Sequence, residues 1–296
     1  MKEKLLDLPK EFFILSDFSG REIMKSVLGN NETFFAYNIG KSIEGKSVEM
    51  FKIGNGGRRV AIFGTHHALE NVTTNILYAF IYILNKGLGT QFCGMDIVTV
   101  LEHSTYYIVP CVNPDGVELY SSGPSCEYMK ERQNQMSGGV FNLWQANARG
   151  VDLNHNYDYR FCEYKLIEKE KGIVPGPSLY SGEYPESEPE SRAVASFIRA
   201  LCPEVVISLH SQGEEIYSFG RRGEKLGSYF ARHSGYRLSS PFGTASYGGL
   251  CDYTGECGIP SLTIEVGKGH NPLHPKAALA ALDALAYPLL GVSTLL

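Results

Sequence analysis

Two residues with metal-binding chemistry lie close together in the segment 60–70, VAIFGTHHALE. His67 and Glu70 have the i, i+3 spacing that places two side chains on the same face of a helical turn. An imidazole and a carboxylate at the end of a strand can supply two ligands of a zinc ion. Such a pair also arises by chance in a chain with eight histidines, so it indicates a metal site only if other segments supply further ligands.

A third ligand could come from His210, which directly follows the apolar segment 204–209, EVVISL. A single histidine at a strand end is more often a core or surface residue, and that alternative stays open for His210. With His67 and Glu70 it would supply two nitrogens and one oxygen, which leaves the fourth zinc position for water, as in catalytic sites. These three residues are therefore the candidate ligands of one Zn²⁺ ion.

Two carboxylates are candidates for supporting roles. Glu265 interrupts the apolar segment 260–266, PSLTIEV, where a carboxylate is costly unless it is paired or lies at the rim of the sheet. It is either part of a structural ion pair or the general base that takes a proton from the attacking water. Asp152, in the segment GVDLN, is suited to accept a hydrogen bond from the free N–H of a ligating imidazole.

The elements that must position these groups alternate along the chain between apolar runs and helical periodicity. This alternation predicts an α/β fold with a largely parallel or mixed sheet. Strands are expected at 47–53, 60–63, 106–112, 204–209 and 260–266, and helices at 70–86, 187–201 and 275–290.

The connecting segments carry strong turn signals. Residues 55–57, Asn-Gly-Gly, predict a hairpin-type turn into the central strand, and residues 113–116, Asn-Pro-Asp-Gly, predict another turn. We expect a helical or irregular lead-in over residues 1–45 and long functional loops over 121–147 and 160–186. No linker or repeat divides the sequence, so we expect a single catalytic domain over residues 1–296.

Composition narrows the functional classes. The 296 residues are 43% hydrophobic and 20% charged, and the net charge of −5 offers no basic surface for nucleic acid or an anionic membrane. The N-terminal segment lacks the apolar run of a signal peptide, and no apolar stretch predicts a transmembrane span. Seven cysteines without a CxxC pair favour reduced thiols. We therefore expect a cytoplasmic protein without nucleic-acid or membrane partners, and the oligomeric state stays open.

Five motifs in order, GTHHALE, VNPDGVEL, GVDLNHNYD, SLHSQGE and SLTIEV, resemble those of the zinc metallocarboxypeptidases over residues 37–267. The resemblance implies a three-layer α/β/α sandwich around a mixed eight-stranded sheet. It also implies the site roles: zinc binding by His67, Glu70 and His210, base catalysis by Glu265, support of a ligating histidine by Asp152, and contact with the substrate carboxylate by Asn154.

The sequence departs from this family pattern next to Asn154. In the digestive and regulatory carboxypeptidases an Arg follows the Asn and grips the terminal carboxylate of the peptide, whereas here the next residue is His155. A neutral imidazole cannot form the bidentate grip of a guanidinium, so ordinary C-terminal trimming is in doubt.

Two further positions also differ from the family. The Arg that helps to polarise the scissile carbonyl is replaced by Gln145, so we expect Arg149 to support the oxyanion instead. The mobile Tyr of the family corresponds either to Tyr247, which directly precedes a Gly-Gly pair, or by strict spacing to Thr244.

The segments WQANARGVDLN, YSGEYPESEPES and HSQGEEIY resemble loops of the bacterial γ-D-glutamyl-meso-diaminopimelate peptidases. Those enzymes hydrolyse the amide between the γ-carboxyl of D-Glu and diaminopimelate in peptidoglycan stem peptides, which implies a small peptide substrate. The zwitterionic end of this substrate needs one protein group that binds its ammonium and another that donates hydrogen bonds to its carboxylate. Glu214 or Glu215 could bind the ammonium, and Arg149, Arg221 or Arg222 could bind the carboxylate. Each of these residues could equally be a solvated surface charge.

Two other functions stay open at this point. The same zinc scaffold could serve an ordinary metallocarboxypeptidase or an acyl-amino-acid deacylase, and His155 argues against the former. The protein could also be a non-catalytic module that binds muropeptides, although such a module would not require Glu265 as a base.

Overall fold

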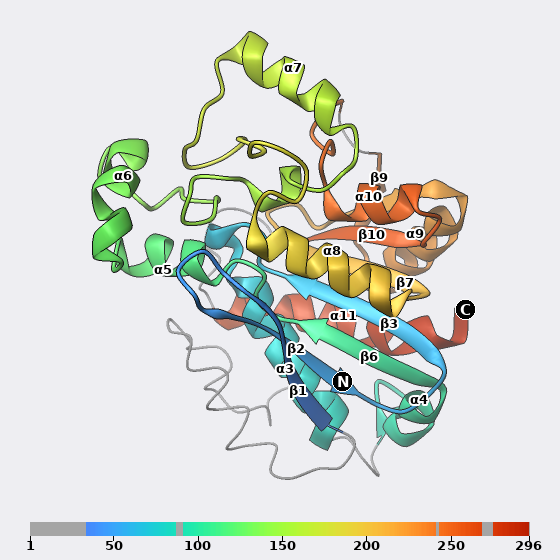
Figure 1. Cartoon of the computed structure of the whole chain (residues 1–296). Helices are drawn as coiled ribbons and strands as arrows, with labels where there is room; N and C mark the ends of the chain where they lie inside the picture. The colour runs from blue at the N-terminus through green and yellow to red at the C-terminus, as the bar shows by residue number, and fades with distance from the viewer. Residues whose placement is uncertain (1–33, 87–90, 241–242, 268–274, 296) are drawn as a thin grey trace.

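The central feature of the computed structural model, which describes residues 34–86, 91–240, 243–267 and 275–295, is a mixed eight-stranded sheet (Figure 1). Its strand order is β1-β2-β6-β3-β7-β10-β8-β9. The strands are β1 (Phe34–Lys41), β2 (Ser47–Ile53), β3 (Arg58–Gly64), β6 (Ser104–Val109), β7 (Val205–Ser211), β8 (Glu215–Phe219), β9 (Arg237–Ser239) and β10 (Ser261–Val266). Two short strands, β4 (Gln91–Phe92) and β5 (Met95–Asp96), pair separately.

Helices cover both faces of this sheet. The α-helices are α3 (Val72–Lys86), α4 (Ile97–His103), α5 (Pro114–Ser122), α6 (Glu127–Ser137), α7 (Phe161–Lys171), α8 (Pro189–Leu201), α9 (Gly220–Ser234), α10 (Leu250–Glu256) and α11 (Pro275–Leu295). Two short 3-10 turns, η2 (Ala68–Glu70) and η3 (Leu153–His155), lie in loops. None of the helices in the described ranges is both long and apolar enough to cross a membrane.

The alternation of side chains along β3 explains the three layers. Val60 and Ile62 join a core cluster with α3, α4, α9 and α11, whereas Ala61 and Phe63 join a second cluster with α8 and α10. Successive side chains of a strand point to opposite faces, so a strand that is apolar at every position must be covered on both sides. Figure 1 shows α8 on one side of the sheet and α3 and α11 on the other. The expected α/β/α sandwich with a mixed eight-stranded sheet is confirmed.

The middle of the sheet is parallel: β3 pairs in parallel with β6 and β7, and β7 pairs in parallel with β10. The carboxyl ends of these strands therefore share one edge of the sheet, beyond which reactive groups gather in open α/β folds. His67 and Glu70 follow β3, and His210 lies near the end of β7.

The expected hairpin between β2 and β3 is wrong, because β6 lies between them in the sheet. The Asn55 and Gly56 amides both donate to the Leu101 carbonyl at the end of α4 (3.2 and 3.1 Å), so the segment crosses the start of β6. A Cβ at Gly56 would lie 2.0 Å from the His103 carbonyl carbon, and this close approach is the reason for glycine there.

Several segments expected to be irregular are regular. β1 lies within the expected lead-in, and residues 1–33 of that segment fall outside the described residues. Residues 113–116 begin α5 rather than forming a free turn: Asn113 caps the helix by accepting the Gly116 amide at 3.0 Å. The expected loops contain α6 and α7, whose apolar periodicity is weak because both helices lie mostly on the surface. The N-cap of α8 is Glu188, one residue after the expected Ser187.

Candidate metal centre

Three side chains from separate segments converge beyond the carboxyl edge of the sheet. His67 precedes η2, Glu70 ends it, and His210 lies in β7. Nδ1 of His67 is 3.2 Å from Oε2 of Glu70, and Nδ1 of His210 is 2.9 Å from the same oxygen. The two Nδ1 atoms are 3.3 Å apart. The structure thus brings together the three residues proposed as ligands from the sequence.

These spacings fit a zinc ion. Zinc bonds of about 2.0–2.1 Å in a tetrahedral arrangement place two ligand atoms roughly 3.3 Å apart. The three measured separations, 2.9 to 3.3 Å, fall close to this value. Two imidazole nitrogens and one carboxylate oxygen are also the donors that zinc prefers. The residues present therefore fit one zinc ion.

The second nitrogen of each imidazole, Nε2, lies within hydrogen-bond distance of another side chain. Nε2 of His67 lies 3.1 Å from Oδ1 of Asp152, the N-cap residue of η3. Nε2 of His210 lies 3.2 Å from the hydroxyl of Ser208. An acceptor on one nitrogen fixes the tautomer so that the other nitrogen presents its lone pair to a metal. Asp152 thus stands where a supporting carboxylate was expected.

The turn before His67 is held in an unusual conformation. Thr65 has φ of +47°, a left-handed value that is costly for a β-branched residue. Its amide donates to Thr73 Oγ1 at 2.8 Å, and its hydroxyl lies 2.8 Å from those of Thr73 and Thr74. These bonds to α3 hold the turn that aims His67 at the site.

Glu265 occupies the strand next to His210. The two residues are Cα partners in the parallel β7–β10 pairing, so their side chains point to the same face. A Cβ at Gly213 would lie 3.0 Å from the Glu265 Cβ, so a side chain there would require its neighbours to shift. Burial raises the pKa of the Glu265 carboxyl well above its usual range, and the negative charge of Glu70 adds to this shift.

The charges of the cluster are strongly coupled. Burial raises the pKa of Glu70, but the positive charges of His67 and His210 outweigh it and bring the pKa to about 2. Burial alone would lower the pKa of His67, but the carboxylates of Glu70 and Asp152 raise it well above its usual range. The carboxylates thus stabilise positive charge at the centre of the site.

Asn154 and His155 are held by hydrogen bonds and by ring stacking. Asn154 Oδ1 accepts the Leu250 amide at 3.1 Å. The His155 ring stacks on Tyr164 with centroids 4.3 Å apart, and its Nδ1 donates to the Tyr247 carbonyl at 2.6 Å. His155 therefore uses one nitrogen and one ring face for contacts with Tyr247 and Tyr164, and its role in substrate binding stays a prediction.

Tyr247 and Arg149 have partners of their own. The Tyr247 hydroxyl accepts a hydrogen bond from Arg160 at 2.9 Å. Arg149 donates through Nε to Glu188 at 2.9 Å, and it lines a cavity of about 180 Å³ with Arg132. The residues that line this cavity do not include the candidate ligands. The catalytic roles suggested for Tyr247 and Arg149 stay predictions.

The other charged residues proposed to bind substrate lie in different parts of the structure. Glu215 is the Cα partner of Glu265 in the β8–β10 pairing, one strand from the candidate base. The adjacent Glu214 has φ of +49° in the turn that leads into β8. Arg222 lines a cavity at the opposite edge of the sheet, so it is too far away to bind a substrate carboxylate at this site. The side chain of Arg221 lies outside the described residues.

Sequence reasoning missed two side chains next to the ligands. Ser208, two residues before His210, shares its strand face, and this period of two could have revealed it. His66 is fully buried, hydrogen-bonds through Nε2 to the Tyr157 hydroxyl at 2.9 Å and stacks on His210. Burial, followed by the charges of His210 and His67, lowers its pKa well below the usual range. No local pattern distinguishes this packed histidine from its neighbour His67, the candidate ligand.

Comparisons with known proteins bear on this geometry. Gamma-D-glutamyl-L-diamino acid endopeptidase 1 of Lysinibacillus sphaericus is 32% identical over 266 residues, which cover 86% of this chain and 65% of that protein. The uncharacterized protein YqgT of Bacillus subtilis (strain 168) is 30% identical over 251 residues, with 79% of this chain and 65% of that protein covered. The chain therefore spans slightly less than two thirds of the length of both relatives.

Solved structures share the fold. A crystal structure of thrombin activatable fibrinolysis inhibitor matches with a TM-score of 0.71 at 21% identity, covering 99% of this chain and 80% of that chain. Murein-tripeptide amidase MpaA from Escherichia coli O157 matches with a TM-score of 0.54 at 21% identity, covering 84% of this chain and 90% of that chain. A family model described as zinc carboxypeptidase matches residues 22–268. Because this match spans most of the chain and includes every residue of the metal centre, the protein belongs to the zinc carboxypeptidase family.

Proposed function

We propose that the protein is a zinc peptidase that hydrolyses the amide between the γ-carboxyl of D-Glu and a diamino acid in peptidoglycan stem peptides. The observation that carries the proposal is the convergence of His67, Glu70 and His210 with Glu265 on the adjacent strand. The relative from Lysinibacillus sphaericus, whose name specifies a γ-D-glutamyl-L-diamino acid bond, supports the choice of substrate.

Each residue of the site has a defined task in this proposal. Zinc, when bound by His67, Glu70 and His210, would polarise the scissile carbonyl and make the attacking water more acidic. Glu265 accepts a proton from that water and returns it to the leaving amine. Asp152 keeps the His67 ring oriented throughout.

The surroundings of His155 argue against ordinary C-terminal trimming. Its Nδ1 donates to a backbone carbonyl, and its ring is stacked on Tyr164. The remaining nitrogen can offer a substrate carboxylate one hydrogen bond at most, whereas a guanidinium offers two parallel ones. A substrate end with its own ammonium group would need a different kind of partner.

An ion pair beside the base supports recognition of a diamino acid. Glu215 is the Cα partner of Glu265, and Arg237 is the Cα partner of Glu215 on β9. The Glu215 carboxylate binds the Arg237 guanidinium and accepts the Tyr217 hydroxyl. A carboxylate and a guanidinium side by side could bind the ammonium and the carboxylate of a zwitterionic substrate end.

The decisive experiment incubates the zinc-loaded protein with L-Ala-γ-D-Glu-diaminopimelate and identifies the products by mass spectrometry. We expect L-Ala-D-Glu and free diaminopimelate. Cleavage of acyl-amino acids or ordinary C-terminal peptides instead would select a deacylase or a carboxypeptidase, and binding without cleavage would select a non-catalytic module.

Glu265→Gln tests the base in the same assay. The variant should retain zinc but lose turnover by about 10²–10⁴-fold, the range for loss of a general base. Glu256→Gln, an exposed substitution of the same chemistry at the end of α10, is the matched control and should keep its activity. Substantial hydrolysis by Glu265→Gln would refute the assignment of the base.

A further inference from the structure

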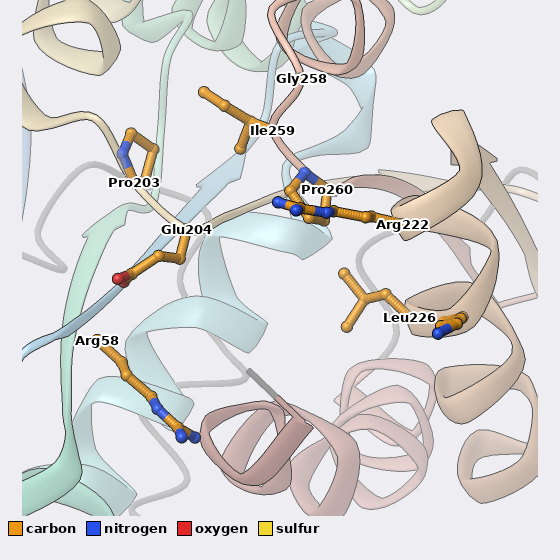
Figure 2. A pocket seen from close by; sticks show the side chains of 9 residues that line it. Arg58, Pro203, Glu204, Arg222, Leu226, Gly258, Ile259 and Pro260 are labelled. Atoms are coloured by element: carbon orange, nitrogen blue, oxygen red, sulfur yellow. The ribbon is translucent and has the colours of Figure 1, made fainter.

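A second cavity, of about 640 Å³, lies at the edge of the sheet where the parallel strands begin (Figure 2). Arg58 is the first residue of β3, Glu204 directly precedes β7, and Pro260 directly precedes β10. The candidate metal ligands lie at the other end of the same strands. Glu204 and His210 are six positions apart, and at 3.3 Å per residue this places the cavity roughly 20 Å from the metal centre.

The lining of the cavity combines three cations with apolar groups. Arg58, Arg222 and Lys225 are the cations, and Leu226, Ile259 and Pro260 are among the apolar residues. Figure 2 shows Arg58 and Arg222 entering from opposite sides, one from β3 and the other from α9. We call this site the basic cavity.

The ion pairs among the described residues do not neutralise the cations of the basic cavity. Arg58, Arg222 and Lys225 form no ion pair with any residue in the described ranges. The one carboxylate in the lining, that of Glu204, accepts the Arg59 amide at 2.5 Å. Three cations against one carboxylate leave a local excess of positive charge in a protein whose net charge is −5.

Two of these cations lie where their positive charges are repelled by their surroundings. Arg222 and Lys225 stand three residues apart near the start of α9, so like charges share one helix face. The positive end of the helix dipole lies at the same end and disfavours cations there. An anion bound between these side chains would relieve both repulsions.

We propose that the basic cavity binds a small polyanion whose negative groups are carboxylates or phosphates. The guanidinium groups of Arg58 and Arg222 suit oxyanions because they offer paired N–H donors in a planar fork. The apolar wall of Leu226, Ile259 and Pro260 accommodates the carbon skeleton of the ligand. This proposal rests on the cavity alone and is independent of the peptidase assignment.

Isothermal titration calorimetry on the zinc-loaded full chain tests the proposal, with inorganic phosphate and the tricarboxylate tricarballylate as separate probes. We expect saturable binding of at least one probe at one site, and the comparison identifies which anionic group is preferred. The double variant Arg222→Ala/Lys225→Ala should weaken binding at least tenfold. Arg232→Ala, which removes one charge from the last turn of the same helix, should change affinity by less than twofold.

Two further readouts keep the result unambiguous. The Glu265→Gln variant, which should retain zinc, should bind the anion as the wild type does, because the basic cavity is remote from the metal centre. The double variant should keep its zinc and its thermal midpoint, and Arg222→Gln/Lys225→Gln replaces it if that midpoint falls. No saturable binding, equal loss in Arg232→Ala, or loss in Glu265→Gln would overturn the proposal.

Discussion

At the scale of single residues, Asp152 links the candidate zinc ligand His67 to the surrounding loop. Its Oδ1 lies 3.1 Å from Nε2 of His67, and its Oδ2 accepts the Leu179 amide at 3.1 Å. The His67 charge lowers the pKa of this buried carboxyl, overcoming the effect of burial, so Asp152 is ionised at neutral pH. The carboxylate thus both orients the imidazole and increases its basicity.

We predict that Asp152→Asn weakens zinc affinity by about 10- to 100-fold, the range for loss of such a supporting carboxylate. Competition with a chromogenic chelator measures the change. Asp158→Asn, an exposed substitution six residues along the same segment, is the control and should bind zinc normally. Equal affinity in both variants would show that Asp152 does not tune the ligand.

A second prediction at this scale concerns the proton that His67 releases when zinc binds. Because Glu70 and Asp152 raise the pKa of His67 well above its usual range, the metal-free protein carries a proton on this ring at pH 7. Zinc requires the neutral ring, so binding should release about one proton from His67 at pH 7. The release should decline as pH rises through the raised pKa, since the proton then leaves before the metal arrives.

Calorimetry of zinc binding in buffers of different ionisation enthalpy measures this release. Glu265 also has a raised pKa, so the Glu265→Gln variant separates its contribution from that of His67. If that variant binds zinc at pH 7 without releasing a proton, the charge state assigned to His67 is wrong.

At the scale of elements, helix α8 holds the turn between β1 and β2. The Ile43 amide donates to Oε1 of Glu190 at 3.1 Å, and Asn147 donates to Oε2 at 3.4 Å. Glu190 is fully buried, and burial, with the nearby charges of Asp115 and Glu188, raises its pKa to about 8. The first turn of α8 therefore carries a carboxyl that is protonated at neutral pH.

This placement predicts a pH-dependent stability. The carboxyl ionises near pH 4.5 when unfolded but near pH 8 when folded, so the wild type loses stability as pH rises between these values. The free energy of unfolding then falls by up to about 1.4 kcal/mol per pH unit. Glu190→Gln, which cannot ionise, should lose less stability than the wild type over this range.

Urea unfolding at pH 5 and pH 8 tests this difference. Glu183→Gln, at an exposed position in the loop before α8, is the control and should follow the wild type. Parallel pH profiles for Glu190→Gln and the wild type would contradict the assigned proton.

At the scale of the whole molecule, the metal centre joins segments that are distant in sequence. His67 and Glu70 follow β3, and His210 lies about 140 residues later in β7. A ligand that binds the folded state alone stabilises it by RT ln(1 + [L]/Kd), about 4 kcal/mol at a thousandfold excess over Kd. Zinc should therefore stabilise the entire fold rather than one loop.

We predict that removing zinc with a chelator lowers the thermal midpoint by roughly 10 °C. Differential scanning calorimetry with and without the chelator measures the shift. His210→Ala should show no shift, because it lacks a ligand, whereas the surface variant His233→Ala should shift as the wild type does. A chelator effect of equal size in His210→Ala would place the stabilising ion elsewhere.

The sequence by itself determined much of the architecture and the candidate ligands. Apolar runs located β2, β3, β7 and β10, because burial on both faces of a sheet demands continuous apolar side chains. The i, i+3 spacing of His67 and Glu70 is local, and His210 directly follows an apolar run, so all three could be named without a structure. Weakly periodic surface helices such as α6 and α7 gave no comparable signal.

Only the tertiary structure decided which distant segments are neighbours. It inserted β6 between β2 and β3, paired Arg149 with Glu188, and placed Arg222 at the edge opposite the metal centre. The physical reason is that periodicity records whether a side chain is buried but not what it is buried against. Strand order and ion pairing depend on crossovers and loops that bring together residues far apart in the chain.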